Sequence, residues 1–224
     1  ELEKFIPMLY ETSGEEKQAE IVPVRKNEGF MDAAQGLYVA RAGNFRAHGF
    51  DYHGALRILK VIMEYDYLWI NIRVKGGAYG CMNGYMKNGD TYFVSYRDPN
   101  LKRTLDVYEG VVDYVKNFTV SDRDMTKYII GTMSNLDQPM TPSAKGERSM
   151  NLYMNKVNED MVRKTREEVL DATQEDIRKL APVLEAILSA DQICVIGSEE
   201  KIEEAKDLFQ TVTSFQNEGE KEDE

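Results

Sequence analysis

The chain has 224 residues, of which 42% are hydrophobic and 30% charged, a composition that is ordinary for a globular protein and sufficient for one sizeable domain. Its formal net charge of -11 argues against a function that depends on nucleic-acid phosphates, because proteins of that kind carry a basic face. An acidic surface is better suited to basic peptides, and no apolar run approaches the roughly 18 residues that a membrane helix needs.

The two ends of the chain and its cysteines indicate its domain organisation and its redox environment. Residues 216–224 contain five acids and one Lys, so we expect them to form a solvated tail behind a single domain at 1–215. Because the chain begins at Glu1 without a Met, we expect it to be a piece of a longer protein. Cys81 and Cys194 lie too far apart for a CxxC motif, and two cysteines are too few for a disulfide framework. This favours a reduced, cytoplasm-like compartment.

In chain order, the first half predicts strands, a long helix and a hairpin. Residues 21–25 and 36–42 are short β-prone runs, the first with a Pro that suits an edge strand. Residues 52–72 carry apolar side chains at helical spacing, which predicts a broad-faced, well-buried helix. The two adjacent stripes of this helix are Leu56, Leu59, Met63 and Tyr67, and Ile58, Ile62, Tyr65 and Trp69. Two alternating segments, 78–86 and 91–97, flank an Asn-Gly pair, a strong hairpin signal.

The second half is mainly helical. After Asp98-Pro99-Asn100 the apolar spacing predicts a helix, and Ser121 followed by Asp124 resembles the capping arrangement of another helix that reaches Leu136. Further predicted elements are helices at 143–157, 159–170 and 174–188, a buried strand at 193–197 and a closing helix at 199–209. Segregation of strands and helices favours an α+β fold with a mainly antiparallel sheet.

The histidines are the first candidates for metal chemistry. His48 and His53 lie five residues apart, which does not place them on one helical face, and Gly49 between them weakens a helix. The stretch also lacks the Glu of an H-x-x-E-H metallopeptidase helix. We therefore interpret both histidines as surface or packing residues and predict no metal ligand in this chain.

Nucleophilic and nucleotide sites are also disfavoured. Neither cysteine can be matched to a His by sequence, and no G-x-S-x-G elbow occurs. The run Gly76-Gly77-Ala78-Tyr79-Gly80 lacks the G-x-x-x-x-G-K-[ST] form of a phosphate loop, and it follows a predicted helix where a phosphate loop would precede one.

The same glycine run has a more informative interpretation. Gly76 and Gly77 leave the backbone uncluttered where the helix turns into a strand, so an extended peptide could approach closely and pair by strand addition. Arg73 and Tyr79 flank the turn and carry hydrogen-bond donors. The alternative is structural: Arg73 caps helix carbonyls and Tyr79 fills the core.

Several motifs together resemble one known family. The stretches 68–80 (Leu-Trp-Ile-Asn-Ile-Arg-Val-Lys-Gly-Gly-Ala-Tyr-Gly) and 95–101 (Ser-Tyr-Arg-Asp-Pro-Asn-Leu) are similar to the C-terminal half of the presequence-protease branch of the insulinase (pitrilysin) metallopeptidases. Weaker similarities follow at 129–132, 137–139, 144–146 and 166–170. The resemblance spans about residues 23–200.

This resemblance implies a zinc peptidase whose two halves enclose a chamber around an unfolded peptide. The zinc ligands belong to the N-terminal half of the same protein, which is this domain's implied partner, and no catalytic residue lies in this chain. Arg73 and Tyr79 match the R-x-x-G-G-A-Y-G motif, whose Arg and Tyr reach the substrate near the scissile bond. With Gly76 and Gly77, which leave the backbone open to a peptide, these two residues form the predicted substrate-binding set.

Two functions therefore compete. One is a domain of a metalloendopeptidase that is inactive alone and supplies substrate-positioning residues; the other is a non-catalytic scaffold or recognition subunit of the same fold. The presence of both Arg73 and Tyr79 favours the peptidase. A bacterial cytoplasmic location is expected, with organellar relatives as the alternative.

Overall fold

The computed structural model describes Lys4, residues 6–8 and residues 26–215. Its centre is one six-stranded sheet of order β3-β4-β2-β5-β1-β6. The strands are β1 (Glu28–Asp32), β2 (Leu37–Asn44), β3 (Gly80–Tyr85), β4 (Asp90–Asp98), β5 (Gln192–Ser198) and β6 (Thr211–Ser214). β1 pairs in parallel with β5 and β6, whereas β2–β4, β2–β5 and β3–β4 are antiparallel. The expected α+β fold with a mainly antiparallel sheet is confirmed.

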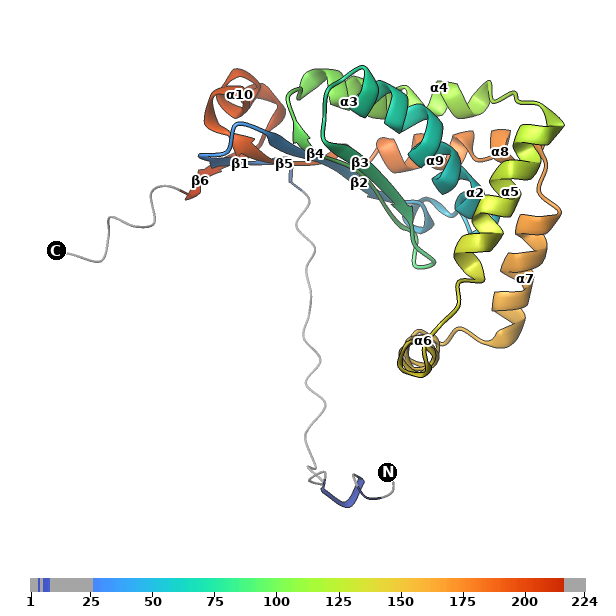
Figure 1. Ribbon diagram of the computed structural model, residues 1–224. Coiled ribbons are helices and arrows are strands. Elements are labelled where there is room, and N and C mark those ends of the chain that lie inside the picture. Colours follow the sequence, from blue (N-terminus) through green and yellow to red (C-terminus); the bar gives the residue numbers. More distant parts are fainter. Residues whose placement is uncertain (1–3, 5, 9–25, 216–224) are drawn as a thin grey trace.

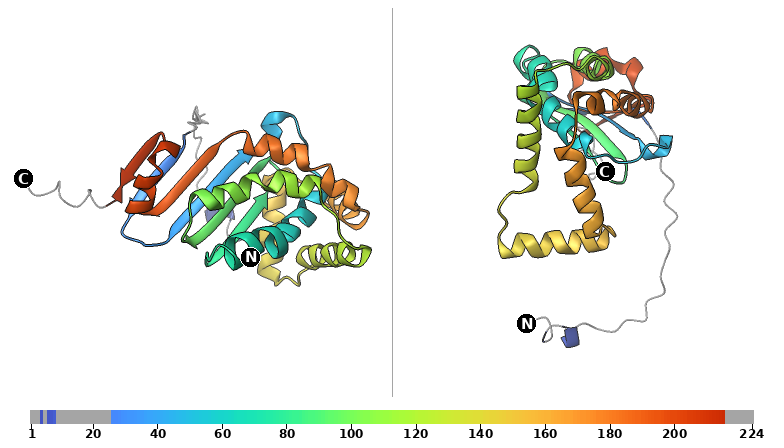
Figure 2. Two further views of the ribbon diagram at one scale, coloured as in Figure 1. Left: turned by 90° about the horizontal axis from the view of Figure 1, so that it is seen from above. Right: turned by 90° about the vertical axis from the view of Figure 1, so that its right-hand side faces the viewer.

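Helices cover one face of this sheet (Figures 1 and 2). They are α2 (Ala55–Ile62), α3 (Lys102–Glu109), α4 (Val111–Lys116), α5 (Asp122–Leu136), α6 (Pro142–Met154), α7 (Glu159–Leu170), α8 (Gln174–Arg178), α9 (Ala181–Leu188) and α10 (Glu199–Glu204), with short 3₁₀ turns η1 (Ile6–Met8), η2 (Arg46–His48) and η5 (Lys206–Leu208). α5 and α7 run side by side beyond the sheet and α6 joins their far ends (Figure 2, right). In α6 no residue is buried.

The hairpin was predicted correctly, and several boundaries were not. β3 and β4 are joined at Gly89, whose φ of 98° explains why Gly is needed there. The predicted helix at 174–188 is two helices, because Pro182 opens α9 and cannot continue α8. The closing helix ends at Glu204, well short of 209, and is followed by η5 and the unpredicted strand β6. The strand expected at 21–25 and the tail at 216–224 lie outside the described residues.

The long helix after Gly54 widens along its length. α2 is followed by two π-helical segments, η3 (Met63–Tyr67) and η4 (Trp69–Val74), in which Lys75 donates its N–H to Ile70 O over 2.9 Å, five residues back. A wider turn rotates side chains away from the positions that a 3.6-residue period predicts. Tyr65 and Trp69, expected in the buried face, are therefore 69% and 42% exposed.

The core lies between the helices and the inner face of the sheet. Leu56, Leu59 and Ile62 of α2 are fully buried there, and so is Phe93 of β4. Tyr108 of α3 is fully buried as well and donates its hydroxyl to Val39 O over 3.1 Å. Burial raises the pKa of the Tyr108 hydroxyl strongly, so the ring stays neutral and ties α3 to β2.

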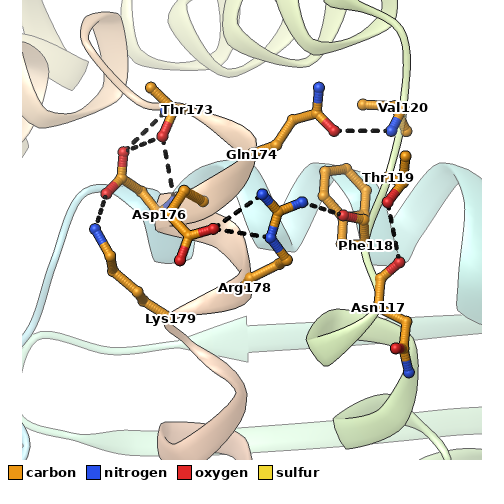
Figure 3. Close-up of polar contacts among 10 residues, drawn as sticks. Asn117, Phe118, Thr119, Val120, Thr173, Gln174, Asp176, Arg178 and Lys179 are labelled. Carbon is orange, nitrogen blue, oxygen red and sulfur yellow. Dashed lines mark hydrogen bonds and ion pairs between the residues drawn. The ribbon is translucent and has the colours of Figure 1, made fainter.

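A polar cluster fixes the start of α8 against the loop that precedes α5 (Figure 3). Arg178 donates to Phe118 O over 2.8 Å, and the Gln174 side chain accepts the N–H of Val120 over 3.0 Å. Thr173 and Asp176 form a complete capping box at the same helix end. The start of α8 is thereby fixed to the segment between α4 and α5.

Within the described residues, no helix combines the length and the apolar character needed to cross a bilayer.

Candidate functional site

The turn that connects the long helix to β3 is closed by backbone hydrogen bonds. Gly77 donates its N–H to Arg73 O over 3.0 Å, and Ala78 donates to Ile72 O over 3.1 Å. Gly77 has a φ of 82°, and a Cβ at Gly76 would lie 2.3 Å from Ile72 O. Both glycines are therefore required by the geometry of the turn itself, one by its backbone conformation and the other by close approach.

The turn is also anchored from the end of β4. The Asn100 side-chain amide donates to Gly76 O over 2.6 Å. Asn100 is itself held by Asp98, which is fully buried and accepts from the Asn100 N–H over 2.9 Å and from the Thr104 hydroxyl over 2.7 Å. Tyr79 donates its N–H to Arg97 O over 3.3 Å. The last residues of β4 and the segment that leads into α3 thus fix the turn at both ends.

Arg73 and Tyr79 lie together outside the core. The Arg73 guanidinium is 4.8 Å from the centre of the Trp69 ring and 5.5 Å from the centre of the Tyr79 ring. It donates a hydrogen bond to Tyr79 O and a longer one, 3.5 Å, to Ala78 O. The guanidinium is therefore held between two aromatic faces, which restricts it without neutralising its charge.

Tyr79 is 58% exposed, so the core-filling alternative does not describe it. Its ring centre lies 5.5 Å from that of Tyr96 and 5.5 Å from the Arg97 guanidinium. Among the hydrogen bonds of the described residues, none involves its hydroxyl. A planar cation and a phenol hydroxyl thus stand side by side at the start of the edge strand β3. This pair can donate hydrogen bonds to peptide carbonyl oxygens.

Three residues that were not predicted as site residues contact the turn or its side chains. Trp69 was expected in the core, and its contact with Arg73 follows from the π-helical turn, although the four-residue spacing of the pair is visible in the sequence. Arg97 and Asn100 reach the turn through β4, at sequence separations that no local pattern reveals.

The two histidines have separate surroundings, and each is described by its own contacts. His53 Nδ1 accepts the N–H of Ala55 over 3.1 Å, and its Nε2 lies 3.9 Å from Glu168. His48 ends the exposed turn η2. Over residues 26–215 and the few described before them, no group of three His, Cys, Asp or Glu side chains could hold a metal ion. These donor sets do not fit the zinc that the resemblance implies.

Both cysteines are free. Burial raises the pKa of the Cys81 thiol to about 11, helped by Glu64 and Asp98, so this thiol stays protonated and unreactive. Burial also raises the pKa of Cys194.

Comparison with known proteins gives one consistent result. Residues 27–199 match the sequence profile of the PreP C-terminal domain. The chain is 44% identical over 190 residues to Protein HypA of Clostridium perfringens, covering 85% of this chain and 20% of that protein. It is 31% identical over 185 residues to Presequence protease 1, chloroplastic/mitochondrial, of Arabidopsis thaliana, covering 82% of this chain and 17% of that protein. The chain thus spans about a fifth of the length of these relatives.

A solved structure has the same fold. The peptidase M16 inactive domain from Pseudomonas fluorescens superposes with a TM-score of 0.55 at 15% identity, over 81% of this chain and 46% of that one. The profile match covers most of the chain, and the presequence protease of Arabidopsis thaliana is among the relatives that the chain matches. The chain belongs to the PreP C-terminal domain family.

Proposed function

We propose that this chain is the substrate-positioning domain of a zinc-dependent peptidase that degrades unfolded peptides, and that Arg73 and Tyr79 contact the peptide backbone near the scissile bond. The observation that carries the proposal is the pair itself: an exposed phenol beside a guanidinium, on a turn that is anchored from two sides. The water-activating groups and the metal would come from the rest of the full-length protein, since the described residues offer no fitting ligand set.

The chemistry of the pair supports this role. A Tyr hydroxyl donates a hydrogen bond to a carbonyl oxygen. This hydrogen bond becomes stronger as negative charge develops on the oxygen. The guanidinium offers several N–H donors in a plane, of which one is engaged by the carbonyls of Tyr79 and Ala78. Because the pair belongs to a different part of the protein from the metal, the site would be complete only when the N-terminal half closes on this domain.

Gly76 and Gly77 would contribute by exposing backbone beside the peptide. β3 is an edge strand, so its outer side is unpaired within the sheet. An extended peptide could add to it through main-chain hydrogen bonds. A bacterial cytoplasmic location accords with the free cysteines and with the similarity to the Clostridium protein.

The test is steady-state kinetics of the full-length enzyme with a peptide substrate. Tyr79→Phe removes one hydroxyl and keeps the ring, so we expect kcat to fall by roughly 100-fold, the scale of one oxyanion donor, with an unchanged melting temperature. Arg73→Lys should also be costly, because an ammonium cannot reproduce the planar fork.

Tyr153→Phe is the matched control, because Tyr153 is 83% exposed on α6, away from the turn. Wild-type kinetics in Tyr79→Phe and Arg73→Lys would remove both residues from the mechanism and favour a non-catalytic scaffold. A raised KM with unchanged kcat would instead mean that the pair binds substrate and transition state equally.

A further inference from the structure

Two guanidinium groups share one exposed aromatic ring. The Arg73 and Arg97 guanidiniums each lie 5.5 Å from the centre of the Tyr79 ring. Like charges held near each other repel, and an exposed ring compensates for only a small part of that repulsion. The arrangement would be stabilised by an anion bound beside Tyr79.

The described residues do not supply that anion. Neither Arg73 nor Arg97 forms an ion pair with any carboxylate among them, whereas Arg166 and Arg178 are paired with acids. The carboxylate next to Arg97 in the chain, Asp98, is buried and turned toward Thr104 and Asn100. The two cations at the turn are therefore available to a ligand.

The backbone holds Arg97 in an unusual conformation at this place. Its φ is 48°, in the left-handed region that non-glycine residues seldom adopt. The pairing of β2 with β4 shifts register here: Leu37 faces Asp98 and Val39 faces Ser95, so β4 carries one extra residue. Such a bulge redirects a side chain, and its left-handed position is ordinarily glycine. An Arg at this position carries a conformational cost that a ligand-binding role would explain.

Two lysines lie close to the turn in a chain that as a whole carries a net charge of -11. Lys75 caps the helix that precedes the glycines. Lys201 of α10 donates over 2.8 Å to the carbonyl of Pro99, which follows Arg97 by two residues. The Lys75 ammonium lies 3.4 Å from Asn71 Oδ1, one turn back along the helix, so of the two lysines Lys201 adds positive charge beside the segment that follows Arg97.

We propose that Arg97 forms a carboxylate-binding subsite beside Tyr79, which selects peptide substrates by an acidic group. This inference rests on the proposed function, in which Arg73 and Tyr79 contact the peptide backbone. A carboxylate accepts two parallel hydrogen bonds from one guanidinium, so Arg97 suits it better than a carbonyl does. The carboxylate comes from either an acidic side chain or the free C-terminus of the peptide.

The experiment measures kcat/KM of the full-length enzyme with matched fluorogenic peptides. In the first arm, the peptides have an amidated C-terminus, and a single Glu is placed at each position in turn and compared with Gln at the same position. In the second arm, a peptide without acidic side chains is compared with a free C-terminal carboxylate and with a C-terminal amide. We expect the wild-type enzyme to prefer one carboxylate-bearing peptide by roughly tenfold, the lower range for a charge-assisted hydrogen bond. The arm that shows the preference identifies the source. Added salt should weaken the preference.

Arg97→Gln should abolish this preference through KM and leave cleavage of the neutral amide unchanged. Arg103→Gln is the control, because it removes one positive charge from an exposed position on the neighbouring α3. Equal loss in both variants, a retained preference in Arg97→Gln, or no preference in the wild type would overturn the proposal. Failure of the proposed function is distinguishable from failure of this inference. In that case the Tyr79→Phe variant would cleave the neutral amide with the same kinetics as the wild type.

Discussion

The side-chain amide of Asn100 donates to the main-chain carbonyl of Gly76 over 2.6 Å and so fixes the turn that carries Arg73 and Tyr79. The two residues are 24 positions apart, and the bond joins the segment between β4 and α3 to the turn that follows η4. Among the hydrogen bonds of the described residues, those of Asn100 go to Asp98 and to Gly76 O, and none goes to the side chain of Arg73 or Tyr79. Asn100 acts through the backbone, and the geometry of the pair depends on it.

Asn100→Ala should therefore lower the activity of the full-length enzyme by roughly tenfold, because small displacements of a positioning group are costly. The lost hydrogen bond should cost about 1 kcal/mol of stability in this chain. Kinetics and thermal unfolding check the two parts. Asn155→Ala is the control, since it removes a similar bond, to Asn151 O over 2.8 Å, at the exposed end of α6. Equal activity loss in both variants would contradict a specific role for Asn100.

Two glycines should respond to the same substitution with opposite sign. At Gly77 an added Cβ has room, with Pro99 3.6 Å away, but the φ of 82° is unfavourable for Ala. Gly77→Ala should destabilise this chain by about 1 kcal/mol. Gly146 lies inside α6 with nothing within 4 Å of an added Cβ, so Gly146→Ala should stabilise by about 0.5–1 kcal/mol. Melting temperatures that shift in the same direction would contradict the turn geometry.

How far the sequence determines this site can be judged from particular residues. The Arg73–Tyr79 spacing, the hairpin at Gly89 and the Ser121 cap all depend on contacts within a few positions, and local patterns predict such features. The burial of Trp69 was predicted wrongly because the apolar pattern assumes 3.6 residues per turn, whereas the helix widens before Arg73. The effect of Asn100 on the turn and the position of Arg97 beside Tyr79 depend on strand pairing and on a bulge, which local patterns do not specify.

The position of β3 at the sheet edge likewise follows from the pairing order. Its partner β4 continues to β2 and then to β5, a strand from the far end of the chain. The parallel pairs that β1 forms with β5 and β6 also connect distant segments, and β6 was not predicted at all. The sequence alone therefore could not show which side of the hairpin remains available to a peptide.

Purified as the 224-residue chain, the protein should bind no molar equivalent of zinc and cleave no peptide. The described residues contain no fitting ligand group, and the two histidines point to separate partners or solvent. Metal analysis after dialysis, beside a fluorogenic peptide assay, measures both. One tightly held zinc per chain would overturn the assignment of the metal to another part of the full-length protein.

The stability of this chain should depend on pH through Asp176. Hydrogen bonds from the Thr173 side chain, with help from Lys179, lower the pKa of this carboxyl from 3.8 to about 2. Thr173 donates its hydroxyl over 2.6 Å and its N–H over 3.0 Å, and Lys179 donates over 3.1 Å (Figure 3). A pKa lowered by folding means that the stabilisation is present above about pH 4 and is lost as the pH falls toward 2.

Urea unfolding between pH 6 and pH 2 gives the measurement. Asp176→Asn should be less stable than the wild type at pH 6 by about 1 kcal/mol, a value that allows for the partial solvent exposure of the carboxylate. The difference should shrink as the pH falls from about 4 to 2, because the wild-type carboxylate becomes protonated and is then neutral, like the amide of the variant. Asp171→Asn serves as the control, since its exposed side chain makes no hydrogen bond among those of the described residues. A difference for Asp176→Asn that stays constant with pH would show that the amide disturbs the capping box by its shape, and that the charge of Asp176 does not stabilise the fold.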